Sequence, residues 1–397
     1  MREQQTIERL REEVVRRFGA AAHDVRVVFA PYRICPLGAH IDHQLGPVTA
    51  LALDRGVLLA YAPAGGREVR LASLAFPGEV RFALDDVPDR REGDWGNFAR
   101  GAVRALALEH SLGRGLVGVT AGAVSEGGLS SSAAIGVAYL LALEDVNALA
   151  VAPEENIRLD QFIENQYLGL RNGILDQSAI LLSRRDHLTL IDCATARHTS
   201  IARAAGMPEF AILVVFSGLR QALVATDYNR RVAECGEAAR ALLEAAGRRA
   251  ETPVLAHVPV EDYAAHRQRL SGAPARRAAH FFSEVDRVRR GVAAWREGDL
   301  AAFGCLMTAS GASSIVNYEC GAPPLIDLYE ILVETGGIYG ARFSGAGFRG
   351  CCIALARPET AAQAAEAVRA RYAQRHPELA AEARAFVCRS DDGARLL

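Results

Sequence analysis

The segment SEGGLSSSAA, at Ser125–Ala134, constrains the fold more than any other part of the chain. It lies between Val117–Thr120, which predicts a short strand, and the apolar run 133–143. Glycines let the backbone approach a ligand closely. A helix that begins after such a loop directs its unpaired N–H groups and its positive dipole end toward that ligand. Three consecutive serines, at 130–132, add hydroxyls, one of which could bind a metal ion. The segment predicts an anion-binding loop; a flexible linker or an ordinary helix cap are the alternatives.

Lysine is absent from the sequence, and all 45 cationic residues are arginine. This excludes Schiff-base chemistry on lysine and the Walker-type phosphate loop, which ends in Gly-Lys-Ser/Thr. The arginines are balanced by 47 acidic residues, for a net charge of −2, so the chain lacks the basic field that holds a nucleic-acid backbone. We therefore expect small-molecule ligands and no nucleic-acid partner.

The 397 residues are enough for two or three domains at roughly 100–200 residues each. Half of them are apolar and 23% are charged, which is typical of a soluble globular protein. The 8 cysteines are scattered without a Cys-x-x-Cys pair, which favours a reducing compartment. The longest apolar runs are about half the roughly twenty residues that a membrane span needs, and no signal peptide is visible. We expect a cytoplasmic protein without a membrane segment.

The hydrophobic patterns predict strands mixed with helices in an α+β fold with two lobes. Apolar residues at one helical face predict an N-terminal amphipathic helix: Ile7, Leu10, Val14, Val15 and Phe18. Predicted strands are Val25–Ala30, ended by Pro31, then material within Val48–Tyr61, and Phe210–Phe216. Predicted helices are Trp95–His110, Glu154–Leu170 and Asn229–Ala246. We place the boundary between the lobes near residues 200–210.

Two further segments are rich in groups that could do chemistry. APYRICPLGAHIDHQLG, at Ala30–Gly46, gathers polar side chains after a strand and predicts a pocket wall. A zinc site from His40, Asp42 and His43, or a plain surface turn, are the alternatives. YGARFSGAGFRGCCIAL, at Tyr339–Leu355, predicts close backbone approach to a ligand or another segment, or else a glycine-rich turn before an edge strand.

Together the three segments resemble the signature segments of the GHMP kinase superfamily, in the family's order and spacing. The resemblance covers almost the whole chain. The galactokinase branch is the nearest, because of WGNFARG at Trp95–Gly101, GLRNGILDQ at Gly169–Gln177, RQALVATDYNRRVAEC at Arg220–Cys235, and the C-terminal SDDGARLL. Within that branch, RICPLGAHIDHQ and GARFSGAGFRGCC are most similar to the kinases that act on D-galacturonate.

The resemblance implies two α+β lobes, residues 1–205 and 206–397, with the active site in the cleft between them. It implies that ATP phosphates lie on the first segment and that Mg²⁺ is held by Ser132 and Glu164, since oxygen ligands suit this ion. The implied nucleotide-binding residues are Gly127, Gly128, Leu129, Ser130, Ser131, Ser132 and Ala133. The third segment contributes Ser344, Gly345, Ala346 and Gly347.

The family's catalytic base corresponds to Asp176, which would take the proton of the sugar's anomeric hydroxyl as its oxygen attacks the γ-phosphorus. An aspartate is a weak base, but it suffices if the transition state is loose, because little charge then builds on the attacking oxygen. Arg33 corresponds to the residue that pairs with this aspartate and faces the transferring phosphoryl group. Whether Asp176 abstracts the proton or mainly orients the hydroxyl is left open by the sequence.

The sugar pocket is implied to contain His40 and Asp42, which match contacts to ring hydroxyls. Where galactokinase has a glutamate for the C6 hydroxyl, this chain has Ala39, and a sugar acid would require that change because a glutamate would repel its carboxylate. Tyr228 and Arg220 resemble further pocket residues. Candidate partners of a substrate carboxylate are Arg220, Arg349 and Arg171.

The implied activity is ATP-dependent phosphorylation of a free sugar at C1, with D-galacturonate as the expected substrate. Galactose, arabinose and glucuronate are alternative substrates, and a non-catalytic sugar sensor is an alternative function. Asp176, Arg33 and the intact loop favour the enzyme over the sensor. His40, Asp42 and the TDYNRR stretch disfavour a branch that acts on mevalonate or homoserine.

Overall fold

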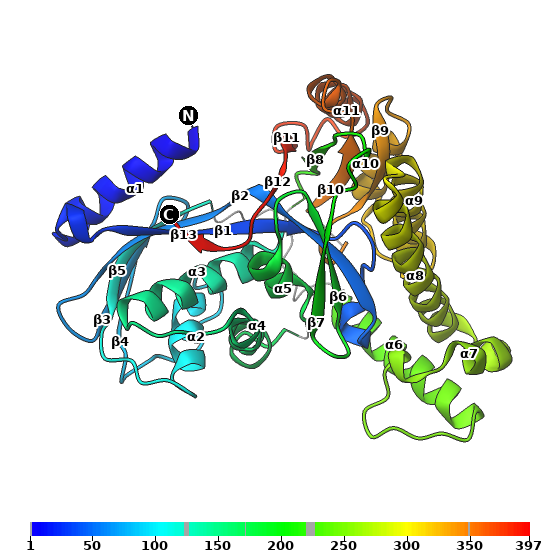
Figure 1. Ribbon diagram of the computed structural model, residues 1–397, viewed down its shortest axis with the longest axis horizontal. Helices are drawn as coiled ribbons and strands as arrows, with labels where there is room; N and C mark the ends of the chain where they lie inside the picture. The colour runs from blue at the N-terminus through cyan, green and yellow to red at the C-terminus, as the bar shows by residue number, and fades with distance from the viewer. Residues whose placement is uncertain (1, 123–126, 171, 220–226, 348–349) are drawn as a thin grey trace.

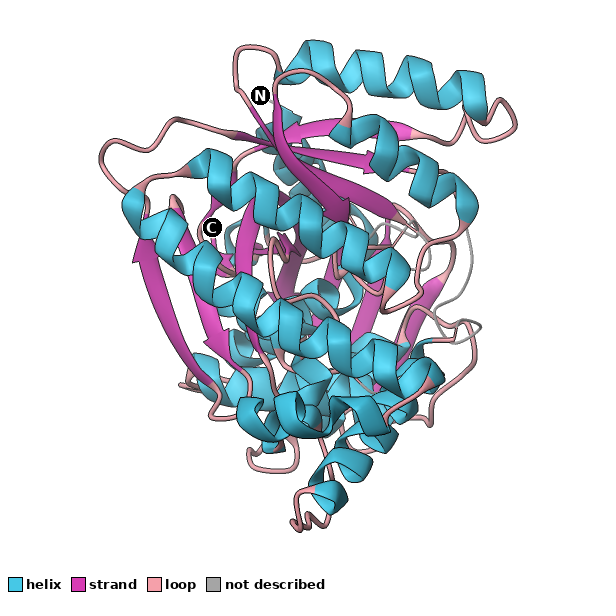
Figure 2. Ribbon diagram, turned by 90° about the vertical axis from the view of Figure 1, so that its right-hand side faces the viewer, coloured by secondary structure: helices cyan, strands magenta, loops and turns pink. Residues whose placement is uncertain are grey.

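Two β-sheets with helices packed against them make up the protein (Figure 1). The computed structural model describes residues 2–122, 127–170, 172–219, 227–347 and 350–397. Viewed from the side in Figure 2, helices cover the strands of both sheets. Within the described ranges, no helix is long and apolar enough to cross a membrane.

The first sheet has the strand order β13-β1-β2-β5-β3-β4, and β6 extends it through β2 and carries β7. β3 and β5 pair in parallel, whereas β1 and β2 are antiparallel. The strands are β1 (Arg26–Ile34), β2 (Pro47–Pro63), β3 (Glu68–Ser73), β4 (Glu79–Ala83), β5 (Leu116–Ala121), β6 (His187–Asp192) and β7 (Arg197–Ala202).

Helices cover both faces of this sheet. The N-terminal helix α1 (Arg2–Phe18) lies on one face, and α3 (Ser131–Val146) lies on the other (Figure 1). Because side chains alternate along β1, Val27 packs in the cluster under α1 while Val28 packs in the cluster under α3. The remaining helices here are α2 (Asn97–Leu106), α4 (Pro153–Phe162), which continues as a π-helical turn (Ile163–Tyr167), and α5 (Leu175–Leu182).

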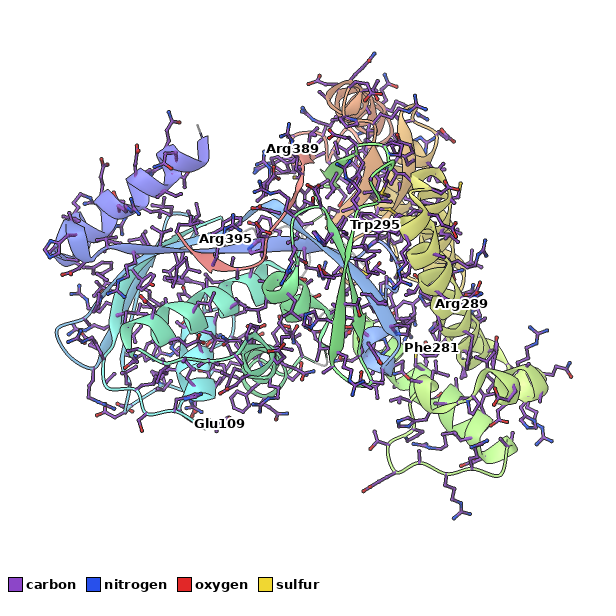
Figure 3. All side chains as sticks on the ribbon, viewed as in Figure 1. Glu109, Phe281, Arg289, Trp295, Arg389 and Arg395 are labelled. Carbon is purple, nitrogen blue, oxygen red and sulfur yellow. The ribbon has the colours of Figure 1, made fainter. Side chains whose placement is uncertain are left out.

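The second sheet is antiparallel, with the order β11-β8-β10-β9. Its inner strand β8 is buried along its whole length, as its unbroken apolar run predicts. The strands are β8 (Ala211–Phe216), β9 (Ile338–Phe343), β10 (Cys351–Ala356) and β11 (Arg384–Cys388). Its helices are α6 (Tyr228–Ala245), α7 (Val260–His266), α8 (Gly272–Glu297), α9 (Leu300–Val316), α10 (Pro323–Val333) and α11 (Ala361–Arg375). Trp295 of α8, labelled in Figure 3, is fully buried, and its ring contacts the rings of Phe210 and Phe303.

One expectation from the sequence is corrected by the strands. Pro31 does not end β1, which continues to Ile34 because the pairing register with β2 shifts between Pro31 and Arg33. Such an irregularity accommodates a residue that lacks an N–H donor. The short strands β12 (Ser390–Asp391) and β13 (Arg395–Leu396) return to pair with β2 and β1. The division at residues 205 and 206, which falls between β7 and β8, stays a prediction.

Candidate active site

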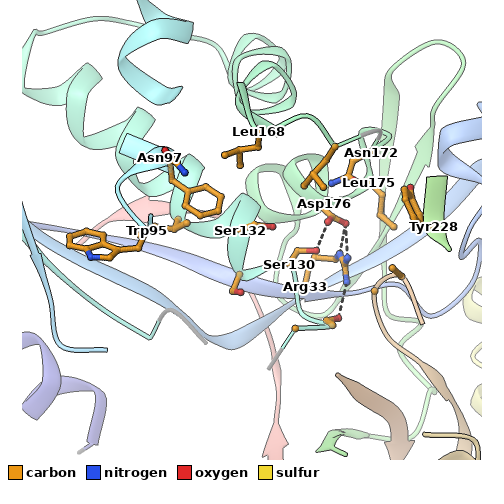
Figure 4. A pocket seen from close by; sticks show the side chains of 18 of the residues that line it. Arg33, Trp95, Asn97, Ser130, Ser132, Leu168, Asn172, Leu175, Asp176 and Tyr228 are labelled. Atoms are coloured by element: carbon orange, nitrogen blue, oxygen red, sulfur yellow. Dashed lines mark hydrogen bonds and ion pairs between the residues drawn. The ribbon is translucent and has the colours of Figure 1, made fainter. Parts of the chain in front are cut away.

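A cavity of about 490 Å³ lies where the three predicted segments meet. Side chains from both halves of the chain line it, including Asp176 from the first half and Tyr228 from the second. In Figure 4, Trp95 and Tyr228 lie at opposite ends of the cavity, and Ser130, Ser132 and Asp176 lie between them. The cavity therefore has an aromatic end, a charged centre and a second polar end.

The glycine–serine loop leads directly into helix α3. Ser130 has a left-handed backbone conformation, and the helix begins at Ser131, so its first N–H groups and positive dipole end are directed at the cavity. The third segment holds the loop from behind: Ser344 Oγ donates a hydrogen bond of 2.5 Å to the carbonyl of Gly128. A Cβ atom on Gly128 would lie 2.8 Å from Cys351 Sγ, so only glycine allows this contact. The loop and the third segment thus form one wall of the cavity.

Asp176, in the first turn of α5, has both carboxylate oxygens bonded. Arg33 Nε donates to Asp176 Oδ1 at 2.7 Å, and Arg33 Nη2 lies 2.6 Å from the same oxygen. Ser130 Oγ donates to Asp176 Oδ2. Arg33 is buried and also contacts the loop, since its Nη1 lies 3.4 Å from the carbonyl of Gly128. The pair is thereby fixed beside the loop and the third segment.

A second carboxylate lies beside Asp176. Glu164, in the π-helical turn after α4, is fully buried and accepts hydrogen bonds from Ser132 Oγ at 2.8 Å and from Asn172 Nδ2 at 2.9 Å. Burial and the nearby charge of Asp176 raise the pKa of Glu164 above its usual range. A hydroxyl and a carboxylate are hard oxygen donors, which fits Mg²⁺. Ser132 and Glu164 are therefore suited to hold this ion next to the loop.

Asp160, one helical turn before Glu164, was missed by the sequence reasoning. It is fully buried, and neither of its carboxylate oxygens has a hydrogen-bond partner among the residues that the structure describes. The signal for it was an aspartate four residues before Glu164, which on a helix places the two on the same face. Asn172 was also missed, although it lies between the predicted Glu164 and Asp176.

Tyr228 lies at the end of the cavity opposite Trp95 (Figure 4), and the charge of Asp42 acts on it. Ala39 and His40, from the same segment as Asp42, also line the cavity. Burial and the charge of Asp176 raise the pKa of Asp42 to about 6. Burial lowers the pKa of His40 well below its usual range, so its ring is neutral. That ring stacks on Tyr318 with 4.3 Å between ring centroids.

The backbone at Ala39 is fixed by a histidine behind it. His280 Nε2 lies 3.0 Å from the carbonyl oxygen of Ala39, and His280 Nδ1 lies 2.9 Å from Ser313 Oγ. Ala39 itself presents only a methyl group to the cavity wall. This part of the site is built from neutral rings, with Asp42 as its carboxylate.

The aromatic end of the cavity was missed by the sequence reasoning. Phe76, Trp95 and Phe98 line it together with Asn97 and Leu168. These side chains come from three elements, so their convergence could not be read from the chain order. Flat apolar rings at one end of a cavity and helix N–H groups at its centre suit a ligand that has a planar ring and an anionic tail.

Most predicted site residues lie at or next to this cavity. The cavity is lined by Arg33, Ala39, His40, Asp42, Gly127, Gly128, Ser130, Ser131, Ser132, Asp176, Tyr228, Gly345 and Ala346. Leu129 and Ala133 are buried beneath the loop, and Gly347 lies behind His40, where a Cβ would be 3.3 Å from His40 Cε1.

Arg171, Arg220 and Arg349 lie outside the described residues. The zinc alternative is not supported, because no group of three or more metal-binding side chains forms in the described chain.

Comparison with family models supports the class of protein that this site indicates. Residues 15–63 match the galactokinase galactose-binding signature, 97–184 the GHMP kinases N terminal domain, and 292–374 the GHMP kinases C terminal model. The chain belongs to the GHMP kinase family, in its galactokinase branch.

Comparison with individual proteins narrows the class of protein further. The chain is 48% identical to galacturonokinase of Arabidopsis thaliana, with 98% of this chain and 97% of that protein covered. It is 34% identical to galactokinase of Roseiflexus sp. (strain RS-1), with 97% and 95% covered. The crystal structure of Lactococcus lactis galactokinase complexed with galactose superimposes with a TM-score of 0.89 at 28% identity, covering 98% of this chain and 99% of that one. The fold and the family predicted from the sequence are thus confirmed, and the chain is a sugar kinase.

Proposed function

We propose that this protein phosphorylates D-galacturonate at C1, using ATP. Asp176 takes the proton of the anomeric hydroxyl, the anomeric oxygen bonds to the γ-phosphorus, and the bond from that phosphorus to the β,γ-bridging oxygen breaks, which releases ADP. The observation that carries the proposal is the position of Asp176, fixed by Arg33 and Ser130 between the anion-binding loop and the sugar-facing end.

The nucleotide would lie along the other half of the cavity. Its base would fit among Phe76, Trp95 and Phe98, and its phosphates would lie on the loop at the start of α3. Ser132 and Glu164 would hold Mg²⁺, which when bound bridges phosphate oxygens and neutralises their charge. Arg33 faces the same region and would stabilise negative charge on the transferring group.

The choice of a sugar acid is supported by the 48% identical relative and by Ala39. A glutamate at this position would place a second negative charge near the substrate carboxylate. Two charges ~4 Å apart at an effective dielectric of ~20 interact by about 4 kcal/mol, which is roughly a thousandfold in affinity. A methyl group removes that repulsion, while His40 and Asp42 remain to bind ring hydroxyls.

The test is a panel of free sugars and sugar acids with ATP and Mg²⁺, followed by ADP release. We expect the highest kcat/KM with D-galacturonate, and a product in which C1 carries the phosphate. Galactose is the second candidate, because a 34% identical relative is a galactokinase. A preference for galactose would overturn the choice of substrate, and ADP release with none of the sugars would favour the sensor. The cytoplasmic location expected from the sequence stays a prediction.

A further inference from the structure

Asp160 on α4 is a buried carboxylate whose partner is missing from the described residues. The residue is fully buried, and both side-chain oxygens lack a hydrogen-bond partner in the described chain. A buried charge without a partner is strongly disfavoured, so such groups are found where an ion, a water molecule or a functional role accounts for them.

The surrounding helices place this carboxylate next to the Ser132–Glu164 pair. Ser132 of α3 is bonded to Glu164 across the contact between α3 and α4. Gly136 lies one turn further along α3, and Asp160 lies one turn before Glu164. A Cβ on Gly136 would be 2.1 Å from Asp160 Oδ1, so the carboxylate occupies space that the glycine leaves free. The two pairs are therefore neighbours in the same helix–helix contact.

Carboxylates gather in this region of the described chain. Asp160, Glu164 and Asp176 are three neighbouring carboxylates, and Arg33 is the cation bonded to Asp176. Burial raises the pKa of Asp160 well above its usual range, and the charges of Glu164 and Asp176 raise it further. Among the described residues a negative charge on Asp160 is therefore disfavoured unless a cation lies nearby, and a divalent cation held by Ser132 and Glu164 would stabilise it.

We propose that Asp160 is part of the magnesium site, where its carboxylate lies behind Glu164 and accepts a hydrogen bond from a water molecule that the ion carries. The inference rests on the proposed function, because it takes Ser132 and Glu164 as the residues that hold the ion. Mg²⁺ usually keeps several of its waters, and groups behind the direct ligands orient them and set the affinity. Asp160 is a positioning residue, since it acts through a water molecule and the neighbouring Glu164 and does not touch the substrate.

The experiment compares ADP binding with and without a divalent ion, by calorimetry on the full chain without sugar. The quantity measured is the ratio of the Kd for ADP in EDTA to the Kd for ADP with saturating Mn²⁺, used in place of Mg²⁺. In Asp160→Asn this ratio should fall about 10–100-fold, the usual effect of losing a group behind a metal ligand. The Kd for ADP in EDTA should stay the same or decrease, because a negative charge near the phosphates is removed.

Glu144→Gln is the matched control, because Glu144 is another buried acid in the contact between α3 and α4. Its Oε2 accepts from Asn156 Nδ2 at 3.2 Å, and its Oε1 has no partner among the described residues. This variant should keep the wild-type ratio. An unchanged ratio in Asp160→Asn, or an equal loss in both variants, would overturn the inference.

Gly136→Ala gives a second test if Asp160→Asn does not fold. The added methyl group would displace the Asp160 carboxylate without removing it, and the ratio should again fall; an unchanged ratio would count against the proposal. If the wild-type protein binds ADP equally well with and without Mn²⁺, the magnesium site itself is wrong, and this inference fails with it. If the wild-type protein binds ADP more tightly with Mn²⁺ and the variants keep the wild-type ratio, the result contradicts only the role of Asp160 and leaves the magnesium site itself standing.

Discussion

The centre of the cavity and its sugar-facing end are built from different kinds of groups. At the centre, Asp176 is bonded to an arginine and a serine, and Glu164 is bonded to a serine and an asparagine. At the sugar-facing end, His40 stacks on Tyr318 and is kept neutral by burial, as is His43. Fully bonded carboxylates thus surround the proposed place of phosphoryl transfer, and neutral rings together with Asp42 surround the proposed place of sugar recognition.

The difference follows from what each end has to stabilise. Charge moves between atoms during transfer, and fixed charges that are already oriented stabilise it without reorganisation. A sugar acid brings its own full charge, so a fixed negative group beside its carboxylate would repel it. Under the proposed function, catalysis at the centre depends on charges that are present, whereas selectivity at the other end depends on a charge that Ala39 leaves out.

The largest expected effect is at the centre. Asp176→Asn removes the proton acceptor and should lower kcat by about 10²–10⁴-fold, the usual contribution of general-base catalysis. Folding and ADP binding should be retained, because asparagine has nearly the same shape; circular dichroism and calorimetry check this. A variant within about tenfold of wild-type turnover would contradict the assignment of Asp176 as the base.

The next effect tests the sugar-facing end. Ala39→Glu should lower kcat/KM for D-galacturonate by up to roughly a thousandfold, and less where water screens the two charges. Its gain for galactose should be smaller, because one hydrogen bond to a charged group contributes about 1.5–3 kcal/mol. Ala39→Gln has nearly the same volume without the charge and should harm galacturonate turnover much less. Equal losses in the two variants would show that the effect is steric.

Much of this site could be predicted from the sequence because its residues lie in short continuous segments. The loop at 127–133 combines glycines with hydroxyls immediately before an apolar helix, a local pattern that needs no knowledge of the fold. Arg33 and Asp176 are 143 residues apart, and only the family resemblance brought them together. The structure confirms that they form an ion pair.

The rest depends on packing between distant elements. Asp160 is one acid among many on predicted helices, where charged residues are ordinarily exposed, so its burial becomes evident only when α3 places Gly136 against it. The aromatic group of Phe76 and Trp95 is formed by residues from separate loops. The return of β13 to β1 is likewise a long-range pairing, which a run of only two residues could not signal.

The proposed metal residues give an intermediate effect. Ser132→Ala and Glu164→Gln each remove an oxygen donor and should raise the Mg²⁺ concentration needed for half-maximal activity by roughly 10–100-fold at fixed ATP. Glu164→Gln should have the larger effect, because it also removes a charge. An unchanged Mg²⁺ dependence in both variants would exclude these residues as ligands. This result would also weaken the contrast between a charged centre and a neutral end.

The smallest effect is a pH dependence that belongs to the sugar-facing end alone. Burial and the charge of Asp176 raise the pKa of Asp42 to about 6, so its carboxylate loses its proton as pH rises through that value. Only the ionised form accepts hydrogen bonds through both oxygens from adjacent ring hydroxyls. KM for the sugar should therefore decrease by about tenfold between pH 5 and pH 7, following the ionised fraction of a group with this pKa.

The neighbouring rings should not contribute to this profile. Burial lowers the pKa of His43 to about 4 and that of His40 further below its usual range, so both stay neutral from pH 5 to pH 7. The measurement is KM for D-galacturonate at saturating ATP and Mg²⁺. Under these conditions the ionisation of Glu164 does not contribute to the measured pH dependence. Asp42→Asn should have a high KM that no longer changes with pH, because an amide has no proton to lose in this range. A wild-type KM that is constant from pH 5 to pH 7 would show that Asp42 does not control sugar binding, and that the sugar-facing end is set by its neutral rings alone.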